Sequence, residues 1–400
     1  QEMQRRGDEE VVVAWHCPTR LVLNGTPHPK KERDIMPVLL TDAPVKLSPP
    51  GPGSAARDRD QGYPMKLYTL LAMTACLVAA PAVTADVLLV GNKSAHTLWA
   101  LDLASGERQA EFETGIGPHE VEVSSDQRYA VVSNYGDRES AGNTLTVIEW
   151  PSERVVRTID LGADTRPHGM AFLTGHRLAV TTEGSNSLLV VDVGLGTVVS
   201  RISVGEGVAH MVAASRDGRF AYVTNISAGT LEKVDVQAGK VLQTIVTGEG
   251  AEGVAMVSDR REVWVTNRGD DAVSVVDAES LEVLATLDSP GFPIRIAITP
   301  DGRRALVTNA RAATLSVFDI RDRKLLTTLQ VADPDAEYQQ TLLGTTALPI
   351  GVEIAPDGKR AFVAISGGNE IAVIDTADWQ IVDRWATGRE PDALGVVLLP

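Results

Sequence analysis

The stretch Tyr222-Val223-Thr224-Asn225 decides the fold, because the chain repeats it. Val265-Thr266-Asn267 and Val307-Thr308-Asn309 repeat its last three residues unchanged, and looser copies place the final position at residues 92, 134, 182 and 365. An Asp-Gly turn precedes several copies, as at residues 217–219, and an acidic residue closes an apolar run after most of them. A period of about 42 residues with short alternating runs between turns is typical of a β-propeller with one blade per repeat.

A single repeat, residues 205–246, contains four short runs with the two-residue alternation and β-branched content of strands. These predicted strands cover residues 211–214, 220–225, 230–236 and 240–246. Four consecutive strands joined by tight turns form one antiparallel blade.

The two ends of the repeat region supply complementary parts of one blade. The repeats begin at residues 87–92 with a second strand, and residues 388–398 match the first-strand segment of the other repeats. Pairing of residues 396–399 with residues 87–90 would close the ring and leave no open edge between the first and last blades. The sequence therefore predicts an all-β, seven-bladed β-propeller over residues 86–400.

The N-terminal segment does not share the repeat. Residues 1–64 show no periodicity and contain a Pro- and Gly-rich run, so we interpret them as a disordered or non-native extension. Residues 65–85 have the charged, apolar and small-residue parts of a signal peptide, which predicts a periplasmic or secreted protein. The apolar run of residues 67–80 is too short for stable insertion across a membrane.

Composition excludes several classes of function. The chain carries 53 acidic and 37 basic residues, a net charge of −16, which argues against nucleic acid as the main partner. Both cysteines, Cys17 and Cys76, precede residue 85, so the propeller has no thiol ligand. The absence of a Cys-x-x-Cys-His sequence, a phosphate-binding loop and Trp-bearing docking repeats argues against haem, nucleotide and PQQ as cofactors.

At this level the chain resembles a known family. The Tyr-Val-Thr-Asn repeat with its Asp-Gly turn is similar to the YVTN family of bacterial β-propellers, over about residues 86–400. Residues 117–121 and 128–136 are similar to a repeat of lactonase-type seven-bladed propellers. The resemblance implies that such a protein is an enzyme, a binding protein or a scaffold, and that some periplasmic members hold zinc through histidines at the channel mouth.

Titratable residues recur at one position of the repeat, the start of the predicted innermost strand. Around the ring this position is occupied, in order, by Asp392, His119, His168, His210, Glu252, Ile294 and Ile350. Three imidazoles with a carboxylate suit a tetrahedral zinc site or another divalent metal. The leading hypothesis is a binding protein with a metal or small-ligand site built from His119, His168 and His210 with Asp392 or Glu252.

Other interpretations of these residues remain open. The histidines can simply hydrogen-bond loop carbonyls between blades. Alternatively, His119 or His168 acts as general base of a lactonase-like hydrolase, with Arg268 or Arg295 at the oxyanion.

Two further hypotheses concern what the propeller binds. Lys93, Arg268 and Arg295 suit a small anionic ligand, unless they form salt bridges with Glu183 and Asp270. The long connection of residues 331–348 is a candidate contact for a protein partner of an interaction scaffold.

Overall fold

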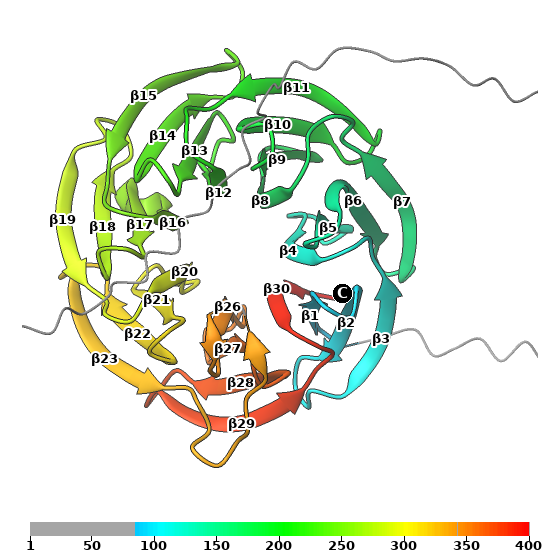
Figure 1. Cartoon of the computed structure of the whole chain (residues 1–400), viewed down its shortest axis with the longest axis vertical. Coiled ribbons are helices and arrows are strands. Elements are labelled where there is room, and N and C mark those ends of the chain that lie inside the picture. The colour runs from blue at the N-terminus through cyan, green and yellow to red at the C-terminus, as the bar shows by residue number, and fades with distance from the viewer. Residues whose placement is uncertain (1–84, 342, 400) are drawn as a thin grey trace, which may run out of the picture. The chain divides into compact units, whose positions relative to one another are not determined.

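The computed structural model describes residues 85–341 and 343–399. These residues form seven four-stranded antiparallel sheets and one two-stranded hairpin. The sheets stand around a common axis as the blades of a propeller (Figure 1). The predicted fold class is thereby confirmed. The predictions for residues 1–64, and for the signal peptide up to residue 84, lie outside the described residues.

Each blade runs from an innermost strand to an outermost one. The innermost strands are β4 (Pro118–Val123), β8 (Pro167–Phe172), β12 (Ala209–Ala214), β16 (Ala251–Val257), β20 (Pro293–Ile298), β26 (Pro349–Ile354) and β30 (Pro391–Val397). The second strands, which carry the repeated motif, are β1 (Val87–Asn92), β5 (Tyr129–Gly136), β9 (Arg177–Thr182), β13 (Phe220–Asn225), β17 (Glu262–Asn267), β21 (Arg304–Asn309) and β27 (Arg360–Ile365).

The third strand of each blade is mostly buried, whereas the outermost strand is mostly exposed. The third strands are β2 (Thr97–Asp102), β6 (Ala141–Glu149), β10 (Ser187–Asp192), β14 (Thr230–Asp235), β18 (Ala272–Asp277), β22 (Thr314–Asp319) and β28 (Glu370–Asp375). The outermost strands are β3 (Arg108–Glu113), β7 (Arg154–Asp160), β11 (Thr197–Ser203), β15 (Lys240–Val246), β19 (Val283–Asp288), β23 (Lys324–Gln330) and β29 (Gln380–Ala386). The short elements are the 3₁₀ turn η1 (Ser258–Arg260) and the hairpin β24 (Gln340–Thr341) and β25 (Gly344–Thr345). The described part of the chain contains no helix with the length and apolar character needed to cross a bilayer.

The ring is closed by strands from opposite ends of the repeat region. β30 pairs antiparallel with β1, and Leu88 lies opposite Val396. The resulting sheet has the order β3-β2-β1-β30, with three strands from the start of the repeats and one from the end. The predicted pairing of residues 87–90 with residues 396–399 is confirmed within about two residues at the C-terminal end.

The hydrophobic core lies between the blades. Each of seven clusters among the described residues joins side chains of two adjacent sheets, for example Leu89 and Leu98 of one blade with Val132 and Ile148 of the next. Another cluster contains Leu88 of the blade that closes the ring and Phe362 of the adjacent blade. Because apolar burial occurs at every blade boundary, the ring buries its core only when all seven blades are in place.

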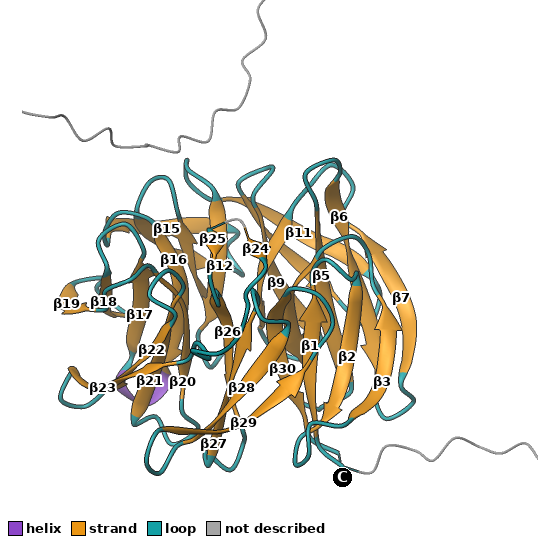
Figure 2. Cartoon of the chain, turned by 60° about the horizontal axis from the view of Figure 1, so that its bottom comes forward, coloured by secondary structure: helices purple, strands orange, loops and turns teal. Residues whose placement is uncertain are grey.

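Turn residues behave as their sequence signals indicate. Asp277, at the end of a third strand, accepts hydrogen bonds from two backbone amides of the following turn, at 2.9 and 2.8 Å, and Asp235 and Asp375 each accept one from the equivalent turn. The loops that join the strands lie at the two ends of the blades (Figure 2).

Where the repeated motif contains a threonine, its hydroxyl group forms a hydrogen bond with the next blade. Thr224 accepts a hydrogen bond from the amide of Met211 in its own blade (3.1 Å) and donates one to the carbonyl of Glu252 in the following blade (2.6 Å). Thr266 and Thr308 make the equivalent donations to Ile294 and Ile350. The repeat therefore holds in place the backbone position at which the titratable residues recur.

Candidate functional site

Three of the predicted site histidines converge at one end of the innermost strands. His119 lies on β4, His168 on β8 and His210 on β12, three strands that are neighbours around the axis (Figure 1). The ring centroids of His119 and His168 are 4.2 Å apart, and those of His168 and His210 are 3.8 Å apart. Residues separated by more than forty positions in the sequence thus form one cluster, as their shared register predicts.

A backbone irregularity aims these side chains at one another. The pairing of each innermost strand with its second strand shifts in register at this point, between Pro118 and Val121 in β4 and between Pro167 and Met170 in β8. Such a β-bulge turns a side chain out of the regular alternation. The bulge therefore allows the three histidines, which belong to three neighbouring blades, to contact one another.

Two glutamates that the sequence analysis missed complete the cluster. Ligand atoms of His119, Glu120 and His168 all lie within 4.8 Å of one another, and so do those of His168, Glu183 and His210. Glu120 directly follows His119, and Glu183 directly follows the third copy of the motif, at Thr182. The position after the motif was a visible signal for Glu183, whereas nothing in the register singled out Glu120.

Glu183 orients His210 and is itself fully engaged. Its Oε1 lies 2.7 Å from Nδ1 of His210, and its Oε2 accepts a hydrogen bond from the hydroxyl of Tyr135. The Tyr135 ring packs edge-on against His119 and His168. Both oxygens of Glu183 are therefore used, whereas Oε1 of Glu120 has the Arg295 guanidinium as its neighbour.

The two predicted acids lie beside histidines. Oδ2 of Asp392 is 2.7 Å from Nδ1 of His119, within ion-pair distance although the angle is not that of a hydrogen bond. Oε1 of Glu252 lies 3.4 Å from Nε2 of His210. Neither acid belongs to the two groups with mutually close ligand atoms. Asp392 and Glu252 are placed to orient the imidazoles of His119 and His210.

Electrostatics keeps the central histidine neutral. Burial, followed by repulsion from His210 and His119, lowers the pKa of His168 well below its usual value. Burial also opposes the charged form of His210, but the neighbouring carboxylates of Glu183 and Glu252 outweigh burial and raise its pKa. His168, which is only 1% exposed, therefore presents uncharged imidazole nitrogens at neutral pH.

Several nitrogen atoms of the cluster lack a hydrogen-bond partner although they are buried. They are Nδ1 of His119, Nδ1 of His168 and Nε2 of His210. Buried polar atoms are normally paired, so the unpaired nitrogens of His168 and His210 leave a place for a ligand, whereas Nδ1 of His119 faces Asp392 at 2.7 Å. Imidazoles and carboxylates are donors that zinc and related ions bind. The residues present therefore fit a divalent metal ion.

The basic residues of this region form ion pairs. Arg268 contacts Glu252 at 2.6 Å, and Arg295 contacts Glu120 at 2.5 Å and Glu252 at 3.5 Å. Lys93 lies 3.3 Å from Asp392. The pairs predicted with Glu183 and Asp270 are thus replaced by pairs with other carboxylates. Burial alone would raise the pKa of Glu252. The attraction of His210, Arg268 and Arg295 exceeds this effect and lowers the pKa to about 2.

Ile294 and Ile350 occupy the repeat position of the histidines in two adjacent blades and offer no metal-binding atom there. Ile294 is buried with Ala310 and Leu348 in a small apolar cluster, with Phe292 and Ile350 packed against it. At this position of the repeat the two blades contribute packing instead of polar groups, although the adjacent Arg295 reaches Glu120 and Glu252.

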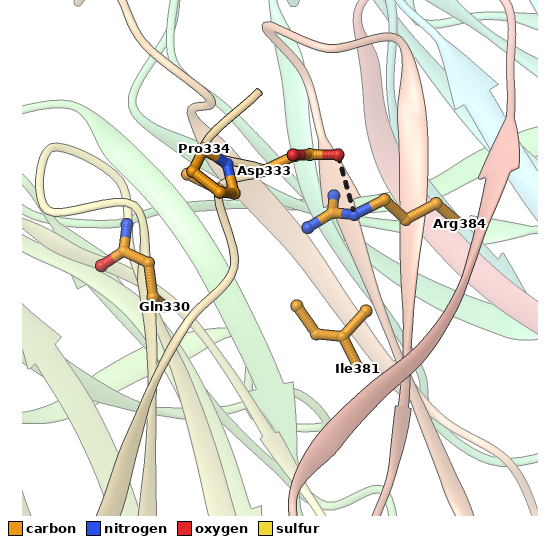
Figure 3. A pocket seen from close by; sticks show the side chains of 6 residues that line it. Gln330, Asp333, Pro334, Ile381 and Arg384 are labelled. Atoms are coloured by element: carbon orange, nitrogen blue, oxygen red, sulfur yellow. Dashed lines mark ion pairs between the residues drawn. The ribbon is translucent and has the colours of Figure 1, made fainter. Parts of the chain in front are cut away.

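The long connection of residues 331–348, which joins β23 to β26, packs on the blade that follows it. Gln339 donates a hydrogen bond to the carbonyl of Ser366, and Asp333 lies 3.9 Å from Arg384 of the outermost strand. Figure 3 shows Asp333 and Arg384 beside a surface pocket of about 580 Å³, with Ile381 and Gln330 on its wall. The proposed contact with a protein partner through this connection stays a prediction.

Comparisons with known proteins agree with the architecture. Residues 174–342 match the family model described as YNCE-like beta-propeller. No curated protein matches the sequence. Among solved structures, the chain is similar to the hydrazine synthase of Kuenenia stuttgartiensis, with 18% identity, a TM-score of 0.60, and coverage of 69% of this chain and 88% of that one. It is also similar to a functionally unknown protein from Desulfotomaculum acetoxidans DSM 771, with 15% identity, a TM-score of 0.65, and coverage of 78% and 99%. At these identities the similarity concerns the fold alone.

Proposed function

We propose that this propeller is a binding protein that holds a divalent transition-metal ion, with zinc as the best match, in the His119, His168 and His210 cluster. The observation that supports the proposal is the convergence of three imidazoles with unpaired, buried nitrogen atoms. A purely structural cluster of histidines would be expected to hydrogen-bond those nitrogens to loop carbonyls.

The hydrogen bonds indicate which groups would bind the ion. His119, Glu120 and His168 form a close group in which Oε1 of Glu120 lies 3.8 Å from Nδ1 of His168. His210 can supply a fourth donor through Nε2, because Glu183 holds its Nδ1. Asp392 and Glu183 would then act as the outer carboxylates that orient metal-binding histidines.

The hydrolase alternative has less support from the geometry. An oxyanion site needs donors aimed at an empty position where charge develops. Arg268 and Arg295, the proposed donors, both point at Glu252, and Arg295 also contacts Glu120. We therefore favour binding over catalysis, and we propose that binding occurs in the periplasm or outside the cell, in keeping with the signal-peptide pattern of residues 65–85.

The proposal is tested on full-length protein purified without an affinity tag or chelator. Elemental analysis should find about one metal ion per chain, and adding zinc to chelator-treated protein should raise its melting temperature. His168→Ala should weaken zinc binding by more than the roughly 10–100-fold cost of losing an orienting group.

The matched control is His176→Ala. His176 is a partly exposed histidine that contacts Asp126 at 2.9 Å and packs against Tyr129, outside the cluster. This variant should bind zinc as the parent protein does. Absence of stoichiometric metal together with an unchanged melting temperature in zinc would refute the proposed function.

A further inference from the structure

Two positively charged side chains contact the ligand atoms that a metal ion would need. Nζ of Lys93 lies 3.4 Å from Nε2 of His119, and a guanidinium nitrogen of Arg295 lies 2.5 Å from Oε1 of Glu120. Both contacted residues belong to the close group that includes His168. In this structure, positive side chains stand where a metal cation would be attracted.

Arg295 reaches Glu120 across the ring. It lies on β20, 175 residues from Glu120 on β4, and its side chain is only 9% exposed. At the same position of the repeat the other blades carry Glu120 itself, Gly169, Met211, Gly253, Gly351 and Ala393, so no other blade has a basic residue there. The arginine is therefore a feature of one blade that places a buried positive charge at the axis.

Lys93 contacts Nε2 of His119, the ring nitrogen that does not face Asp392. The carboxylate of Asp392 beside Nδ1 favours the tautomer with the proton on that atom, so the lone pair of Nε2 faces Lys93. Lys93 comes from the loop after β1 and its side chain is 34% exposed. An ammonium that donates to Nε2 has to move away before the same lone pair can bind an ion.

We propose that Lys93 and Arg295 set the metal affinity of this site, because each occupies a ligand atom of the His119–Glu120–His168 group and has to release it when an ion binds. The inference rests on the proposed metal-binding function. Each residue lowers the affinity in two ways: it competes for a ligand atom, and it repels the incoming cation at short range in a poorly solvated environment. The residues thereby favour ions that bind imidazole strongly over ions that bind carboxylate alone.

The test measures zinc affinity by competition with a chelating dye, on full-length, tag-free, metal-free protein. Lys93→Met and Arg295→Met keep side-chain length and remove the charge. Each variant should bind zinc at least about tenfold more tightly than the parent, which corresponds to about 1.4 kcal/mol.

Arg268→Met is the matched control. Arg268 lies in the same region, is 28% exposed, and contacts Glu252, which is outside the close group. Its replacement also removes one positive charge but releases no atom of that group, so its effect should be clearly smaller. Affinities of the Lys93 and Arg295 variants that are no higher than that of the Arg268 variant would overturn the inference.

A double-mutant cycle shows whether Arg295 acts through Glu120. In a Glu120→Gln background, Arg295→Met should no longer raise the affinity, because the released ligand atom is missing. An undiminished gain in that background would contradict the mechanism. If Arg295→Met folds poorly because Glu120 is left unpaired, Lys93→Met, at a partly exposed side chain, provides the comparison with Arg268→Met.

Failure of the inference differs from failure of the proposed function. If the parent protein binds zinc and the two variants bind it no more tightly, only the inference fails. If neither the parent nor the variants bind zinc, the metal site itself is refuted. Binding by the variants alone supports both.

Discussion

At the scale of single residues, Glu232 departs from the repeat. Blades with a serine at this position of the third strand, such as Ser274 and Ser316, use it to accept a hydrogen bond from the motif asparagine. In β14 this position is occupied by Glu232, which is buried. Both polar side-chain atoms of Asn225 therefore lack a hydrogen-bond partner. Burial raises the pKa of this carboxyl group.

Glu232→Ser is expected to stabilise the propeller by about 1 kcal/mol, because it restores the hydrogen bond of Asn225 and removes a buried carboxyl group. A folded-state pKa above the unfolded value means that the contribution of Glu232 is most favourable at low pH and is lost as the pH rises through the folded pKa. The advantage of the variant should therefore grow with pH. Denaturant unfolding at several pH values checks this, with Glu232→Gln as a control of similar size. A variant less stable than the parent at alkaline pH would contradict the explanation.

Asp392→Asn is expected to weaken zinc binding by about 10–100-fold without abolishing it, since the carboxylate orients His119 instead of binding the ion. Titration with a chelating dye measures the loss. A loss as large as that of His168→Ala would instead make Asp392 a direct ligand.

At the scale of elements, the motif strand is connected to the next blade through its threonine. Thr224→Val keeps the shape of the side chain but leaves the amide of Met211 and the carbonyl of Glu252 without their hydrogen bonds. We expect a loss of about 1–3 kcal/mol in the free energy of unfolding. Thr230→Val, at the start of β14 in the same blade, is the control. Equal effects of the two variants in denaturant unfolding would show that the connection between blades is unimportant.

At the scale of the whole molecule, the ring brings two further carboxyl groups near each other. Glu122 of β4 and Glu353 of β26 share one register two positions beyond Glu120, where the other innermost strands carry alanine or glycine. Burial, followed by repulsion from Glu353 and Glu120, raises the pKa of Glu122 to about 8, and burial raises that of Glu353 to about 7.

Stability is therefore expected to fall between about pH 6 and pH 9. Both folded-state pKa values exceed the value of about 4.3 for an unfolded chain, so the stability that depends on the protonated carboxyl groups is lost as the pH rises through 7 and 8. The melting temperature of metal-free protein measured across this range should decline. Glu122→Gln combined with Glu353→Gln should flatten the decline, and an equally steep decline in this variant would contradict the assignment.

Much of the fold followed from periodicity. Motif spacing predicted the blades, and the matching ends predicted the pairing of β1 with β30. The register of His119, His168 and His210 also predicted their convergence, because equivalent positions of a ring lie around one axis. Glu120 and its pairing with Arg295 escaped prediction, because a shared position of the repeat does not show which side chains of distant blades reach across the axis.

The sequence by itself determined the number of blades, the closure of the ring and the residues that meet near its axis, because these depend on the order and period of short patterns along the chain. Only the tertiary structure decided which nitrogen and oxygen atoms remain free and which are covered by Lys93, Asp392 or Arg295. The reason is physical: a β-bulge and a contact across the ring set side-chain direction within a few ångströms, and a repeat period carries no information at that resolution.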